Sequence, residues 1–191
     1  LTKRLAIEQS RHVALRIVEA LGKVGDEMSL NVLVAAGESS PYSGVRAEAA
    51  LAVGRYAYRG IKNKTAVQFV ADLIERNATD EAWKAAYAMM RVADSVLLAR
   101  YTSILLRSAS SADVHTRMFS AAALSKSGLT RDIVNTLLSL ALQDSDWRVR
   151  VNSIKALAGV GRSLQARVIP VMLTLLADSS EHVSLTAAST L

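Results

Sequence analysis

A ten-residue phrase that returns six times is the feature that most limits how this chain can fold. It is clearest in Val149-Arg-Val-Asn-Ser-Ile-Lys-Ala-Leu-Ala158, and its other copies begin at Val13, Val45, Trp83, Thr116 and Val183. Successive copies start 32, 38, 33, 33 and 34 residues apart. A repeat of this length predicts one small structural unit stacked on copies of itself, which is a solenoid.

Each unit is predicted to be two helices joined by a tight turn. Before the phrase, apolar residues such as Val134, Leu137 and Ala141 recur with the three-to-four-residue spacing of an amphipathic helix. The first, or A, helices are predicted near 27–37, 64–77, 95–108, 130–143 and 164–177, with a partial one at 1–7. The second, or B, helices are predicted near 9–22, 41–56, 80–92, 112–126, 145–158 and 179–191. The sequence thus predicts one all-α array with repeats at approximately 1–22, 26–56, 64–92, 95–126, 130–161 and 163–191.

The connections between helices contain residues that favour helix ends. Five residues before most phrases stands a serine or an acid, such as Ser40 or Asp144, whose side chain can accept a hydrogen bond from the first helical turn. Pro41 is expected at the first helical position. Gly22 and Gly54 are interpreted as helix stops.

The pattern resembles the HEAT-repeat family, in its short, alanine-rich bacterial form, over essentially the whole chain. The strongest stretches are 168–178, which has a proline inside its A helix, and Asp144 to Arg150. The resemblance implies a right-handed α-solenoid whose B helices line the concave face. It also implies that basic residues beside the turns bond to turn carboxylates and hold the repeats together. The residues that match this role are Arg46, Lys84, Arg117 and Arg150. The family pairs such a residue with an acid six positions before it, and here only Arg150, with Asp144, has that acid.

The sequence contains no recognisable catalytic, cofactor or metal site. Its three histidines, His12, His115 and His182, each precede a phrase, but they belong to repeats at least two steps apart. Packed helices lie about 8–10 Å apart, which is too far for these residues to share one metal. The chain has no cysteine, and no nucleophile or phosphate-loop motif stands out. We therefore expect a protein that is not an enzyme and has no cofactor.

The B helices are expected to carry the binding surface. The fourth and seventh residues of each phrase share one side of the helix, and we place that side outward. In the second to fourth repeats this side is apolar apart from Glu48, whereas it is polar at both ends of the array. The predicted protein-binding residues are Leu51, Ala86, Met89, Phe119 and Ala122. An apolar patch with a polar rim indicates a site for a protein or an extended peptide. The alternative is that these residues pack between repeats.

Two other functions compete with this interpretation. Four cations, Arg55, Arg59, Lys62 and Lys64, lie in one acid-free segment with tyrosines between them, as phosphate binding favours. Nucleic acid is therefore the alternative ligand, although the segment also fits a solvated loop. The chain could instead be a regulatory or spacer arm of a larger enzyme, because some bacterial cyclophilin-type prolyl isomerases resemble this arrangement.

The ends and the composition complete the expectations. The chain begins at Leu1 and ends inside a repeat, without the polar caps that solenoids need, so we expect a fragment of a longer protein. No apolar run approaches the roughly 18 residues of a membrane span, and no leader is recognisable, so we expect a cytoplasmic protein with no membrane partner. The net charge of +6 permits acidic partners without requiring them.

Overall fold

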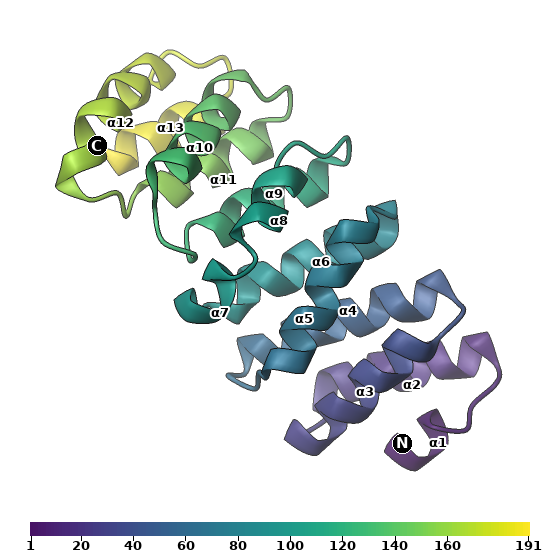
Figure 1. Ribbon diagram of the computed structural model, residues 1–191. Helices are drawn as coiled ribbons and strands as arrows, with labels where there is room; N and C mark the ends of the chain where they lie inside the picture. The colour runs from purple at the N-terminus through teal and green to yellow at the C-terminus, as the bar shows by residue number, and fades with distance from the viewer.

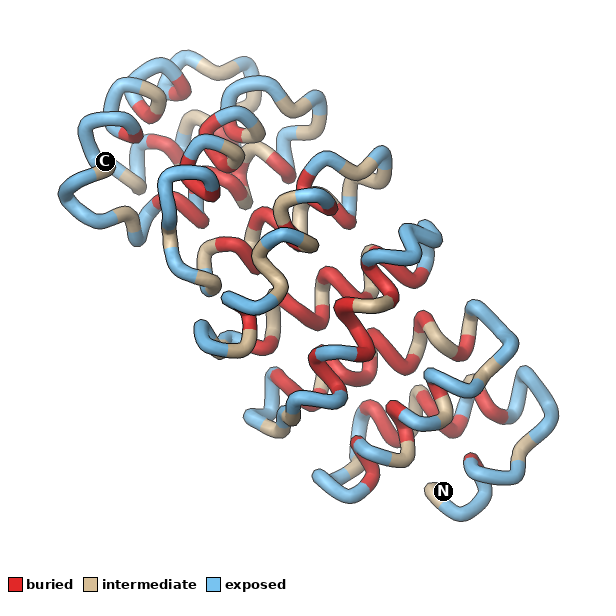
Figure 2. Tube along the Cα trace, in the orientation of Figure 1, coloured by how far each residue is buried: buried red, intermediate tan, exposed pale blue.

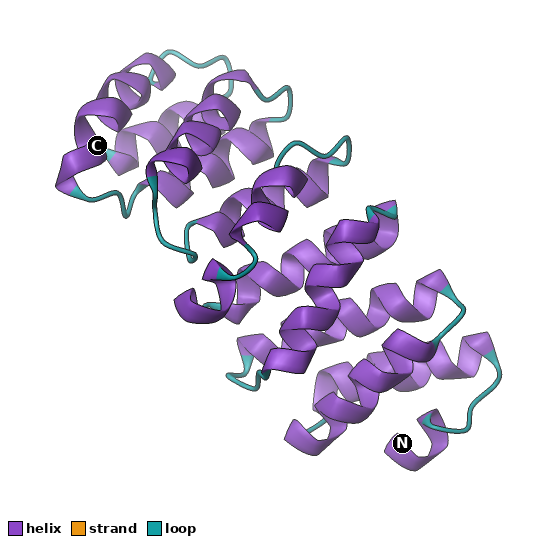
Figure 3. Cartoon of the chain, in the orientation of Figure 1, coloured by secondary structure: helices purple, strands orange, loops and turns teal.

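The computed structural model describes all 191 residues as thirteen helices connected by short loops, with no strand (Figures 1 and 3). The A helices are α1 (Thr2–Leu5), α3 (Glu27–Ser39), α5 (Lys64–Arg76), α7 (Ser95–Ala99) with α8 (Thr102–Ser108), α10 (Arg131–Gln143) and α12 (Arg162–Leu175). The B helices are α2 (Arg11–Val24), α4 (Ser43–Tyr58), α6 (Thr79–Val92), α9 (Val114–Leu124), α11 (Trp147–Leu157) and α13 (Glu181–Thr190). The predicted all-α solenoid of about six units is confirmed.

The helices form two layers, which Figure 1 shows with most A helices in front of the B helices. Within the B layer each helix packs against the next, from α2 through α4, α6, α9 and α11 to α13. Each A helix also contacts the B helix of its own unit. The two layers enclose a continuous core, because every long helix turns its apolar side toward the other layer. Figure 2 shows this core as buried segments that run the length of the array.

Two glycines allow successive B helices to approach closely. A Cβ atom on Gly22 would lie 2.7 Å from the Cβ of Ala52, and one on Gly54 would lie 2.8 Å from the ring of Tyr87. The interpretation of these glycines as helix stops is wrong, because α2 continues to Val24 and α4 to Tyr58. Only a residue without a side chain fits at these two contacts.

Most B helices begin two residues later than predicted. Ser40, Ser111, Asp144 and Asp178 do not cap a helix, because each side chain accepts a hydrogen bond from the backbone N–H two residues later, still in the turn. True caps follow at Asp113 and Asp146, which accept from the N–H groups of Thr116 and Arg148. Pro41 lies in the turn, since α4 begins at Ser43. These side chains therefore stabilise the turn and delay the helix start.

The A helix predicted at 95–108 is interrupted at Arg100 and Tyr101. The N–H of Tyr101 bonds to the carbonyl of Leu98, three residues back, so the chain tightens before α8 begins. The Tyr101 hydroxyl donates to Oε1 of Gln68 on α5, at 2.9 Å, which joins this turn to the preceding A helix. No helix of the chain combines the length and the apolar character that a membrane span requires.

Candidate functional site

The pattern of burial places the third copy of the phrase two residues earlier than the sequence suggested. In the other repeats the fifth residue of the phrase is buried and the seventh is not, and in all of them but the last the sixth and ninth residues are buried as well. In the third repeat this pattern begins at Glu81 instead of Trp83. Measured from Glu81, the two spacings of 38 and 33 residues become 36 and 35, which are closer to the rest of the array.

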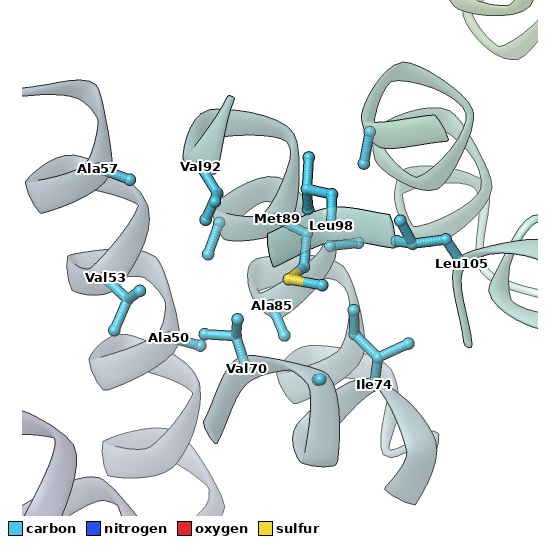
Figure 4. Packing of buried hydrophobic residues seen from close by; sticks show 14 of the residues in the cluster. Ala50, Val53, Ala57, Val70, Ile74, Ala85, Met89, Val92, Leu98 and Leu105 are labelled. Carbon is cyan, nitrogen blue, oxygen red and sulfur yellow. The ribbon is translucent and has the colours of Figure 1, made fainter. Parts of the chain in front are cut away.

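This shift overturns part of the predicted binding surface. Ala86 and Met89 are completely buried, and Figure 4 shows the Met89 side chain among core residues of α5, α6 and the following repeat. Their assignment to an exposed surface is wrong. Leu51, Phe119 and Ala122 are half-buried. In the third repeat, the side of α6 that corresponds to theirs carries Lys84 and Tyr87 instead.

One side of every B helix stays unburied and forms a continuous surface, which we call the B-helix face. It comprises the residue before each phrase and the fourth, seventh and eleventh residues of the phrase, which are three or four positions apart and so share a side. Its members are His12, Arg16, Glu19, Lys23, Gly44, Glu48, Leu51, Arg55, Asp80, Lys84, Tyr87, Arg91, His115, Phe119, Ala122, Lys126, Arg148, Asn152, Lys155, Gly159, His182, Thr186 and Ser189. All are half-buried or exposed.

Aromatic side chains occupy the centre of this face. The rings of Tyr87 on α6 and Phe119 on α9 meet edge to face, with centroids 5.4 Å apart. Trp83 contacts the same group, 6.3 Å from Phe119 and 5.7 Å from His115. The sequence analysis began the third phrase at Trp83 and therefore missed this cluster. The signal that could have revealed it is the four-residue spacing of Trp83 to Tyr87 and of His115 to Phe119, which puts both pairs on one side of their helices.

The B-helix face carries most of the chain's net charge. Eight of its residues are basic and three are acidic, so the face has a net charge of +5, out of +6 for the whole chain. Four of the cations, Lys23, Arg55, Arg91 and Lys126, form a column at the C-terminal ends of successive B helices. Cations are favoured there because the helix dipole places partial negative charge at that end.

The charged groups of the face differ in how they are paired. Glu19 accepts hydrogen bonds from Lys23 at 2.7 Å and Arg16 at 2.9 Å, and these bonds lower its pKa to about 2. Glu48 pairs with Arg55 at 2.9 Å and lies 3.6 Å from Lys84 on the next helix.

Three other cations of the face have no carboxylate partner in the chain. Arg91 lies over the rings of Tyr58 and Tyr87, 4.9 and 5.2 Å from their centroids. Lys126 and Lys155 are exposed and form no ion pair. The cations that are free to meet a partner's charge are therefore in the third to fifth repeats.

The four cations of the proposed nucleic-acid segment are mostly engaged within the chain. Arg59 donates to the backbone carbonyls of Gly22, Lys23 and Gly25 at 2.7–3.0 Å. Lys62 donates to the carbonyl of Val92 and pairs with Asp94 at 3.4 Å, while Arg55 is held by Glu48. Lys64 alone lacks such a contact. Three of the four cations thus stabilise the structure and do not form a free patch.

Three arginines connect successive repeats, but the expected pair of Arg150 with the Asp144 carboxylate is wrong, because each arginine bonds to an acid of the next repeat. Arg46 bonds to Glu81 at 2.6 Å, Arg117 to Asp144 at 2.7 Å and Arg150 to Asp178 at 2.9 Å. Each arginine also donates to the backbone carbonyl of the residue six positions before it. In each case the acid comes from the next repeat. The hydrogen bond to Asp144 holds the pKa of Arg117 above its usual value.

Lys84 is not part of this arginine column. The position that corresponds to Arg46, Arg117 and Arg150 in the third repeat is Ala82, because the phrase there begins at Glu81. Consequently, no ion pair of this kind joins the third repeat to the fourth. The aromatic contacts of Trp83 and Tyr87 with the fourth repeat join the two units at this step instead.

One cleft lies at the N-terminal end, away from the centre of the B-helix face. It has a volume of about 660 Å³ and is lined mainly by apolar residues of α1 to α4. Its one charged side chain, Glu8, is already bonded by Arg4 at 2.7 Å and by the N–H of Ser10 at 2.8 Å. The cleft thus lacks the convergent free polar groups that orient a small ligand.

The histidines do not assemble into a metal site. No group of three or more histidine, cysteine or acidic side chains is placed to hold an ion. His182 stacks on Trp147, with ring centroids 4.4 Å apart, and His115 contacts Trp83. That the chain binds no metal stays a prediction.

Helix pairs stacked in two layers, with one unburied helix face shared by all units, define an α-solenoid repeat protein. The family model of HEAT repeats matches residues 1–91 and 134–191, and the chain belongs to this family. A search of curated protein sequences finds no match.

Solved structures share the fold at low sequence identity. A designed armadillo repeat protein in complex with the peptide (KR)4 has a TM-score of 0.74 and 16% identity, covering 99% of this chain and 95% of that one. An engineered protein has a TM-score of 0.77 and 18% identity, with the same coverage. The archaeal HEAT-like repeats protein from Thermococcus onnurineus NA1 has a TM-score of 0.63 and 13% identity, covering 99% of this chain and 77% of that one.

Proposed function

We propose that the chain is a non-catalytic scaffold that binds a protein or an extended peptide along the B-helix face. The observation that carries this proposal is the half-buried apolar centre of the face, formed by Leu51, Tyr87, Phe119 and Ala122 across three successive B helices. Apolar side chains bounded by polar ones are typical of protein-binding surfaces. The designed armadillo repeat protein, which binds a peptide, supports the proposal through its shared fold.

The aromatic residues suit the role of binding anchors. Tyr87 and Phe119 fix each other's orientation through their edge-to-face contact, so little conformational entropy is left to lose when a partner binds. Adjacent helices lie about 8–10 Å apart, and an extended chain advances about 3.3 Å per residue. A segment of roughly nine to twelve residues would therefore cover the three or four central B helices.

Selection from a random peptide library tests the proposal directly. Twelve-residue peptides displayed on phage would be selected on the immobilised chain, and photo-crosslinking would locate the bound peptides. We expect crosslinks to α4, α6 and α9. Replacing Tyr87→Ala and Phe119→Ala together should weaken binding about thirtyfold, which corresponds to about 2 kcal/mol for losing the central anchors.

A matched control removes apolar side chains from the other layer. Met28 on α3 and Val96 on α7 are 81% and 72% exposed, and Met28→Ala with Val96→Ala should leave peptide affinity unchanged. Circular dichroism would verify that both double variants remain helical. Crosslinks confined to the A helices, or full binding by the folded Tyr87 and Phe119 variant, would contradict the proposal.

A further inference from the structure

We infer that the segment bound along the B-helix face is acidic, with apolar side chains between its carboxylates. This inference rests on the proposed function and specifies the chemistry of the partner. Its basis is the distribution of charge. The 23 residues of the face carry a net charge of +5, whereas the remaining 168 residues carry 15 basic and 14 acidic side chains, a net charge of +1.

The cations flank the apolar centre on two sides. Neighbouring B helices pack side by side, and the contact of Glu48 with Lys84, both the fourth residue of their phrases, shows that equivalent positions lie close together. Lys23, Arg55, Arg91 and Lys126 therefore form one row, and Leu51, Tyr87 and Ala122 lie about one helical turn, or roughly 6 Å, closer to the N-terminal ends. Arg16 and Lys84 lie another turn beyond. A segment lying across the middle row would meet cations on both sides.

A basic peptide is a poor fit to this surface. The designed armadillo repeat protein with the same fold was solved with the peptide (KR)4. On the present chain such a peptide would face Arg91, Lys126 and Lys155, none of which has a carboxylate partner. Like charges brought together at an interface weaken binding. We therefore expect the two proteins to prefer peptides of opposite charge, although they share a fold.

Nucleic acid fits less well than an acidic peptide because acids lie among the cations of the face, although the row of Lys23, Arg55, Arg91 and Lys126 contains none. Glu48 lies between Arg55 and Lys84 in the middle of the face, and Glu19 and Asp80 lie on either side of it along the array. A nucleic acid strand presents a phosphate at every nucleotide and would repeatedly meet these carboxylates. A peptide can place a neutral residue there and its own acids opposite Arg91, Lys126 and Lys155.

Three probes of equal length separate these ligands. We would measure the binding of (Glu-Asp-Leu)4, (Lys-Arg-Leu)4 and a twelve-nucleotide oligothymidylate by fluorescence anisotropy. The acidic peptide should bind most tightly at about 50 mM salt and weaken about tenfold at about 300 mM, because salt screens exposed charges. Tighter binding of the basic peptide or of the oligonucleotide would overturn the inference.

A pair of charge-reversal variants tests the location of the cations. Lys126→Glu with Lys155→Glu reverses two exposed, unpaired cations of the B-helix face. Arg76→Glu with Arg100→Glu reverses two exposed, unpaired arginines of the A layer and changes the net charge equally. The first variant should weaken the acidic peptide at least about tenfold and the control less than about twofold, since exposed charges act mainly over about one Debye length. Equal effects would show that net charge alone attracts the peptide.

The library selection distinguishes failure of this inference from failure of the proposed function. Selected peptides that crosslink to the B-helix face should be enriched in Asp and Glu. Peptides that crosslink there but are neutral or basic would refute the inference and leave the proposed function intact. Selection of no peptide, together with no binding of the acidic probe, would contradict both.

Discussion

The ion pair between Arg117 and Asp144 should stabilise the array far more than the pair between Arg107 and Glu75. Both pairs join neighbouring repeats through short contacts, of 2.7 Å and 2.6 Å. They differ in burial, because the side chains of Arg117 and Asp144 are 14% and 5% exposed, and those of Arg107 and Glu75 are 64% and 48% exposed. The comparison therefore isolates the effect of solvent on a similar interaction.

The expected magnitudes follow from these contacts. Asp144→Ala removes two hydrogen bonds from Arg117, at 2.7 and 3.0 Å. A hydrogen bond to a charged group contributes about 1.5–3 kcal/mol, and water that reaches Arg117 would recover part of it, so we expect a loss of about 2–4 kcal/mol. Glu75→Ala should cost about 0–1 kcal/mol, because exposed pairs are screened.

Urea denaturation followed by circular dichroism measures these changes in the free energy of unfolding. Asp144 also accepts a bond from the N–H of Asp146 at 2.9 Å, so a double-mutant cycle with Arg117→Ala is needed to isolate the pair. The coupling energy should be about 1.5–3 kcal/mol, against less than about 0.5 kcal/mol for Arg107 and Glu75. Equal coupling energies in the two cycles would refute the argument from burial.

Two further predictions concern helix packing and pH. Gly54→Ala should destabilise the chain by about 1–3 kcal/mol through overpacking against Tyr87, whereas Gly159→Ala, which meets no heavy atom within 4 Å, should change little; equal urea midpoints would contradict the close approach of α4 and α6. The pKa of Asp146 is lowered to about 2, mainly by its hydrogen bonds from Arg148. Because its unfolded value is about 3.9, this stabilisation is complete above about pH 4 and is lost as the pH falls toward 2. Asp146→Asn should flatten the fall in stability across that window, and an unchanged slope would contradict this assignment.

The repeat fold was predictable because its signals are redundant. Six copies of the phrase locate the B helices, and the apolar spacing of residues such as Val134 and Leu137 locates the A helices independently. The break at Tyr101 was not predictable in this way, since it depends on a hydrogen bond to Gln68 of another repeat. Gly22 and Gly54 were misread for the same reason, because their closest neighbours belong to the next B helix.

The candidate site was predicted only in part, because the third repeat permits two alignments. The alanines around Trp83 fit the phrase in either position, and the other phrases begin with Val or Thr, which an acid such as Glu81 does not resemble. Glu81 is nevertheless 1% exposed, because Arg46 of the preceding repeat neutralises it. The column of Lys23, Arg55, Arg91 and Lys126 was the sequence signal for the correct alignment.

Residues that interact between neighbouring repeats have a nearly uniform separation along the sequence, and this has a consequence for folding kinetics. Hydrogen bonds between neighbouring repeats join residues 27 to 37 positions apart, from Arg117 with Asp144 to Arg59 with Gly22. The entropy of closing such a loop is nearly the same everywhere in the chain and does not grow with the number of units. Folding can therefore start at any adjacent pair of units, at a rate set by one local closure and not by the 191-residue length.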